Sequence, residues 1–195
     1  MGKNRLEAFS DGVLAIIITI MVLEIKVPHE ATLNALGELI PVFLSYLLSF
    51  IYVGIYWNNH HHLLHTAKQV SGGILWANLH LLFWLSLIPF ATGWMGENHF
   101  AAAPSALYGV VLMMAAIAYF ILQQTIMAAD RQDAVLKKAL GSDLKGRGSI
   151  VLYATAIPLA FYANAFSQTI YVAVALIWLV PDRRIERVLG DGKGG

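Results

Sequence analysis

Four histidines stand close together near the end of a long uncharged segment: His60, His61, His62 and His65. Imidazole is a common ligand for zinc and copper, and its charge changes near neutral pH. His61 and His65 are spaced i, i+4 and therefore share one face of a helix. The pattern allows three interpretations: a metal site, a pH-sensitive group, or contacts between helices. No Asp or Glu lies within the cluster, which weighs against a metalloenzyme.

A second polar group occurs at the start of the first hydrophobic segment, where Arg5, Ser10 and Asp11 precede an uncharged stretch from Gly12 to Leu23. Twelve residues are too few to cross a bilayer, which takes about 20. The helix must therefore carry ionisable groups into or near the membrane. Such groups normally face a protein interior or a water-filled path.

Helix geometry divides this segment into two faces. At about 100° per residue, Ile16, Ile20 and Leu23 fall within roughly 60° of one another, with Thr19 at the edge of the stripe. Asp11 lies about 140° from Ile16. If the stripe lines an opening, the polar residues point back into the subunit. Otherwise the stripe is an ordinary packing surface.

Composition identifies the class of protein that must position these residues. The chain is 58% hydrophobic and 13% charged, against roughly 25% charged residues in a soluble domain. The sequence therefore predicts an all-α integral membrane protein whose surroundings are the lipid bilayer. A net charge of +1 gives no basic face for nucleic acid, and the absence of cysteine excludes thiolate metal sites and disulfides.

Long uncharged runs separated by charged or turn residues predict six transmembrane helices in one domain, residues 1–195. A run of 31 residues, 150–180, is interrupted by Asn164 and Gln168 and is best divided into two helices. The connector 130–147 and a flexible tail, 188–195, complete the chain. The expected spans are 5–27, 36–62, 73–96, 104–129, 148–164 and 167–181.

The distribution of basic residues predicts the orientation. With six spans, one side of the membrane collects twelve of the thirteen Lys and Arg residues, and the other side has Lys26 alone. By the positive-inside rule, both termini are expected in the cytoplasm.

The sequence from Arg5 to Asp11 resembles the Arg-x-x-x-Phe-Ser-Asp signature of the transmembrane protein 175 family of potassium channels. Gly-Val-Leu-Ala-Ile-Ile-Ile-Thr after it, and Trp57-Asn-Asn-His60-His61 further on, are also similar to family sequence. The resemblance covers essentially the whole chain in the number and length of its spans.

The resemblance implies a homotetramer that conducts K⁺ through a central pore lined by the first helix, without cofactor. The Thr-Val-Gly-Tyr-Gly filter sequence of ordinary potassium channels is absent. By position, Ile16 is expected to form the narrowest hydrophobic constriction, Thr19 a ring of hydroxyls, and Ile20 and Leu23 the continuing lining. A single six-helix repeat favours a prokaryotic plasma membrane.

The motif itself is interpreted as a scaffold, in which Arg5 pairs with Asp11 of its own or a neighbouring element. Asp11 and Ser10 are expected to hydrogen-bond toward Trp57 or the histidines. The expected scaffold residues are Arg5, Phe9, Ser10, Asp11, Trp57, His60, His61 and His80.

Two alternatives remain open from the sequence. The histidine cluster His60–His65 could form the site of a membrane metalloenzyme or small-molecule transporter inside one subunit. Asp11 could itself be an ion-coordinating ring, which requires a helix face inconsistent with Ile16 lining the pore.

Overall fold

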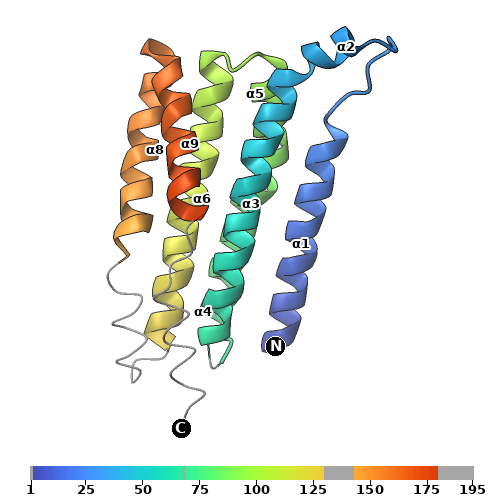
Figure 1. Cartoon of the computed structure of the whole chain (residues 1–195). Helices are drawn as coiled ribbons and strands as arrows, with labels where there is room; N and C mark the ends of the chain where they lie inside the picture. Colours follow the sequence, from blue (N-terminus) through green and yellow to red (C-terminus); the bar gives the residue numbers. More distant parts are fainter. Residues whose placement is uncertain (1, 68, 130–142, 180–195) are drawn as a thin grey trace.

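The computed structural model describes residues 2–67, 69–129 and 143–179, which are helical and contain no strand (Figure 1). The all-α prediction is confirmed for this part of the chain. Figure 1 shows the long helices side by side, with a short helix lying across one end. The helices are α1 (Lys3–Leu23), α2 (Leu33–Glu38), α3 (Ile40–Thr66), α4 (Gly72–Ser86), α5 (Ile88–Glu97), α6 (Ala102–Ala129), α8 (Leu144–Tyr162) and α9 (Asn164–Leu179).

Prolines explain two helix boundaries that the expected ranges did not contain. The expected span 36–62 begins inside the separate short helix α2, and α3 starts beyond it with Pro41 in its first turn. The expected span 73–96 is divided into α4 and α5 at Leu87, with Pro89 in the first turn of α5. Proline lacks a backbone N–H, so it is tolerated where a helix begins and interrupts one in its interior.

The last hydrophobic run folds as two helices. The first, α8, ends at Tyr162, and Ala163 has an extended φ of −153°. Asn164 begins α9, and its side-chain amide donates to the carbonyl of Phe100 in the turn before α6. One turn later, Gln168 donates to Ser105 Oγ at 2.7 Å. The expected span end at 181 and the tail 188–195 lie outside the described residues, as does most of the connector 130–147.

Four helical segments of the described chain are long and apolar enough to cross a membrane by length and composition. The shorter helix α9 is also apolar. The four segments are Lys3–Leu23, Ile40–Thr66, Gly72–Glu97, which combines α4 and α5, and Ala102–Ala129.

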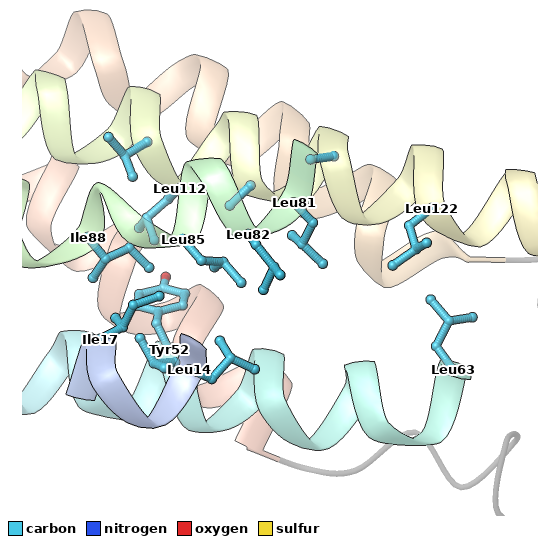
Figure 2. Close-up of a cluster of buried hydrophobic side chains, with 14 of the residues drawn as sticks. Leu14, Ile17, Tyr52, Leu63, Leu81, Leu82, Leu85, Ile88, Leu112 and Leu122 are labelled. Carbon is cyan, nitrogen blue, oxygen red and sulfur yellow. The ribbon is translucent and has the colours of Figure 1, made fainter. Parts of the chain in front are cut away.

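The first helix packs on α3, α4 and α5, while α6 packs on α4 and α8 further along the bundle. Figure 2 shows Leu14 and Ile17 of α1 beside Tyr52 of α3, facing Leu85 and Ile88 across the core. These five side chains are at most 3% exposed. One face of α1 is therefore held by three helices.

Buried hydroxyl groups connect α3 to the rest of the bundle. Tyr52 donates to the carbonyl of Tyr171 at 2.6 Å and accepts from Tyr153 at 3.2 Å. Ser49 is bonded to Thr92 at 2.6 Å and to Tyr108 at 2.9 Å. Because an unsatisfied polar group inside a membrane is costly, these bonds fix α3 relative to α5, α6, α8 and α9. Helix α1 then packs against a fixed support.

Candidate functional site

The two faces of α1 differ sharply in burial. Ser10, Leu14 and Met21 on one face are 0%, 1% and 1% exposed. On the opposite face Ile16 is 57% and Leu23 is 78% exposed. A helix surrounded by its own subunit would not leave such a stripe uncovered. The exposed stripe must therefore meet lipid, water or another copy of the chain.

All four residues expected to line a pore lie on this exposed face: Ile16, Thr19, Ile20 and Leu23. Thr19 Oγ1 donates to the Ile16 carbonyl at 2.9 Å. Since the hydroxyl proton is engaged with the helix backbone, the lone pairs of the oxygen are left for an external donor or cation. The stripe thus presents apolar groups and one polar acceptor.

Behind the stripe, Ser10 belongs to a buried chain of hydrogen bonds. Asn78 of α4 donates to Ser10 Oγ at 3.0 Å, and its carbonyl oxygen is 2.6 Å from His60 Nε2 of α3. Since the amide oxygen can only accept, His60 carries a proton on Nε2 in this contact. Ser10 also donates to the Leu6 carbonyl at 2.9 Å. The chain of bonds joins α1, α4 and α3 at one level.

A second set of contacts joins the start of α1 to the end of α3. Trp57 donates to Asp11 Oδ1 at 3.0 Å, and Lys3 donates to the His65 carbonyl at 2.8 Å. The indole of Trp57 stacks on His61, with ring centroids 6.4 Å apart. The two helices are antiparallel, so these contacts set their register. Asp11 is thus bonded to one of its expected partners, Trp57, whereas Ser10 is bonded to Asn78, which was not among them.

Sequence reasoning did not include Asn78, the residue at the centre of the buried chain. Its signal was a lone amide within the apolar segment 70–96. Polar residues in such segments almost always find partners within the bundle.

Two predicted scaffold residues have different surroundings from those expected. Arg5 is exposed and forms no ion pair with Asp11 within the described chain, and Asp11 accepts from Trp57. Phe9 is 50% exposed, on the same side as Ile16. Pairing of Arg5 with Asp11 of a neighbouring element stays a prediction.

His80 also lies apart from the motif network. Its Nε2 accepts from Trp84, one turn along α4, at 3.0 Å. No hydrogen bond links it to Ser10, Asp11 or Trp57 in the described part of the chain.

The rings of His61, His62 and His65 lie next to one another at the end of α3. The centroids of His61 and His65 are 4.5 Å apart, and those of His61 and His62 are 5.7 Å apart. Over residues 2–67, 69–129 and 143–179, no three His, Cys, Asp or Glu side chains are grouped so that they could hold a metal ion. The ring contacts of these three histidines are with one another and with Trp57, all within α3.

A groove is lined by residues of α1 and α5 on the side of the exposed stripe. Ile16 and Ile20 line its inner part, together with Phe90. Glu24 and Glu97 line its other end. The groove therefore leads from the middle of α1 to the end of the helix opposite the N-terminus.

The apolar helices, the buried polar network and the exposed stripe define a multi-pass, all-helical membrane protein. The family model described as "Endosomal/lysosomal potassium channel TMEM175" matches residues 5–89. A potassium channel of Chryseobacterium sp. (strain P1-3) is 57% identical over 98% of this chain and 100% of its own length. The chain belongs to the TMEM175 family.

Further relatives support this assignment. A potassium channel of Streptomyces collinus is 36% identical over 60% of this chain and 61% of its own length. The crystal structure of a lysosomal potassium-selective channel TMEM175 homolog from Chamaesiphon minutus has a TM-score of 0.78 and 28% identity. It covers 92% of this chain and 97% of that chain. The family's proton channel from Gallus gallus is 29% identical over 68% of this chain and 30% of its own length.

Proposed function

We propose that this chain is one subunit of a potassium channel in the plasma membrane. Its membership of the TMEM175 family supports the proposal, as do the names of its bacterial relatives. These relatives are named as channels, which favours a channel over the metalloenzyme and transporter alternatives.

The subunits form a homotetramer in which four copies of α1 surround a central pore. The observation that carries this proposal is the one-sided burial of α1, since three helices cover its back while Ile16 and Leu23 stay uncovered. From Ile16 to Leu23, the groups on that face are apolar residues and one hydroxyl, as expected of a neck that passes a partly dehydrated ion.

Ile16 forms the narrowest point and gates the pore by dewetting, because a narrow apolar neck expels water and hydrated ions. Ile20 and Leu23 continue the lining. Selectivity arises because K⁺ loses part of its hydration shell at lower cost than Na⁺. Thr19 compensates for part of that loss, since its oxygen can accept while its proton remains bonded to Ile16.

The six spans are α1, α3, the α4–α5 pair, α6, α8 and α9, with both termini in the cytoplasm. Lys3 and Arg5 lie at the start of α1, and Lys145 and Arg147 at the start of α8, whereas Lys26 follows the opposite end of α1. This distribution follows the positive-inside rule.

Potassium-driven flux into liposomes tests the proposal, with Na⁺ as the competing ion. Ile16→Asn should raise flux or reduce selectivity, because a polar neck stays wet. Val22→Asn is the matched control, since Val22 is 46% exposed and lies about 120° around the helix from Ile16. Absence of K⁺ flux from both wild type and Ile16→Asn would refute the channel. An equal effect of the two variants would refute the assigned pore face.

A further inference from the structure

We infer that Glu24 supplies the negative charge that draws cations to the outer mouth of the pore, and that the Lys26–Glu97 ion pair sets the net charge beside it. This inference rests on the proposed channel with α1 at its centre. Glu24 would affect the rate at which ions enter the pore, whereas Ile16 and Thr19 would affect gating and selectivity at the neck.

The first support is the position of Glu24 on the conduction path. Glu24 follows the last residue of α1, one residue beyond Leu23 of the exposed stripe. It lines the same groove as Ile16 and Ile20, so the groove connects the carboxylate to the proposed neck. The side chain rests against α5: its Cγ and Oε2 come within 3.8 and 3.6 Å of where a Cβ on Gly93 would lie. The Glu24 side chain thus lies against α5 within this groove.

The second support is the difference between the two carboxylates of the groove. Glu97 is neutralised by Lys26, with Nζ and Oε1 2.6 Å apart. Glu24 has no ion-pair partner within 4 Å among the described residues. The pKa of Lys26 is raised, mainly by the hydrogen bond to Glu97 and its charge, with a smaller contribution from the charge of Glu24. Lys26 therefore stays charged at neutral pH, and the groove keeps one uncompensated negative charge per subunit.

The helix end adds to this charge. The carbonyl groups at the C-terminus of a helix carry about half a negative charge, and α1 ends at Leu23 without a basic residue in its last turn. Four copies around an axis would bring four carboxylates and four helix ends to one mouth. Such a ring raises the local concentration of cations and lowers that of anions.

Because Glu24 acts through its field, its effect must depend on ionic strength. The screening length is about 30 Å at 0.01 M salt and about 3 Å at 1 M. A charge beside the axis therefore influences ion entry in dilute solution and is screened in concentrated solution. A residue that shaped the neck would affect conductance at both concentrations.

The test is single-channel conductance of the full-length protein in planar bilayers, in K⁺ at about 0.01 M and about 1 M on the outer side. Glu24→Gln should lower conductance at least about twofold in dilute K⁺ and leave it nearly unchanged in concentrated K⁺. Lys26→Gln should change it in the opposite direction, because it leaves Glu97 unpaired. The double variant Lys26→Gln/Glu97→Gln keeps the net charge and should behave like wild type.

Glu30→Gln is the matched control, because Glu30 is exposed in the α1–α2 connection and does not line the groove. Its effect in dilute K⁺ should be smaller than that of Glu24→Gln. Equal conductance of wild type, Glu24→Gln and Lys26→Gln in dilute K⁺ would overturn the inference. So would a Glu24→Gln loss that persists in concentrated K⁺, or an equal loss in Glu30→Gln. If Glu24→Gln does not assemble, the opposite shift expected of Lys26→Gln still decides. Loss of wild-type K⁺ current would instead refute the proposed function.

Discussion

Removing the hydroxyl of Ser10 tests whether the buried network holds α1 in place. Ser10→Ala deletes the acceptor of the Asn78 amide, a bond of 3.0 Å, and the donor to the Leu6 carbonyl. The carbonyl of Leu6 keeps its helical hydrogen bond from the main-chain N–H of residue 10. The main loss is therefore the interhelical hydrogen bond, which leaves the buried Asn78 amide without its acceptor.

The expected destabilisation follows from these two losses. A buried donor left without a partner costs roughly 1–3 kcal/mol, and interhelical hydrogen bonds in membranes average about 0.6 kcal/mol with a maximum near 1.7. We therefore expect Ser10→Ala to lower the free energy of unfolding by about 1 kcal/mol. In an Asn78→Leu background the same change should cost less than about 0.5 kcal/mol, because the donor is already gone.

Reversible unfolding in mixed detergent micelles, followed by tryptophan fluorescence, measures these differences. Ser86→Ala is the control, because its exposed hydroxyl donates only to the Phe83 carbonyl of its own helix, at 2.8 Å. It should change the unfolding free energy little. If Ser10→Ala and Ser86→Ala cost the same, or if the Ser10→Ala cost is unchanged beside Asn78→Leu, the network does not hold α1.

Two further predictions concern the pore face and the packing of α3 on α5. Thr19→Ala should reduce the K⁺/Na⁺ permeability ratio measured from reversal potentials, and an unchanged ratio would exclude the hydroxyl from selectivity. Gly96→Ala should lower the unfolding free energy by about 1–3 kcal/mol, because its Cβ would lie 2.8 Å from Val42 Cα and against Ser45 Oγ. Gly54→Ala in α3 has open space within 4 Å and should not destabilise, so equal losses would contradict the close-packing explanation.

The orientation of α1 was predictable because it depends on local periodicity. Helix geometry put Ser10 and Asp11 on the side away from Ile16, and the structure buries Ser10 while exposing Ile16. The pairing of Asp11 with Trp57 was among the contacts expected. Pore lining by these residues stays a prediction, because a single chain does not contain the axis around which it would assemble.

Contacts between distant segments were less predictable. Lys26 and Glu97 are 71 residues apart, and their ion pair depends on how α1 and α5 end at the same level. Arg5 was expected to pair with Asp11 of its own or a neighbouring element. Within α1 the two side chains lie six residues and about 120° apart, so Arg5 remains exposed while Trp57 of α3 reaches the Asp11 carboxylate. His80 was expected to join the motif network, but it accepts a hydrogen bond from Trp84, one turn away on its own helix.

The polar contacts behind α1 explain why a scaffold would lie so close to a proposed neck. Apolar packing alone gives little preference for one rotation of a helix in lipid, because the surrounding tails are as apolar as the neighbouring helices. Ser10 is bonded to α4 and Asp11 to α3, so two directional contacts fix the rotation of α1. Ile16 follows Asp11 by five residues, and any rotation at Asp11 would turn Ile16 through the same angle. Ser10 and Asp11, which do not face the proposed pore, would thereby determine that Ile16 does.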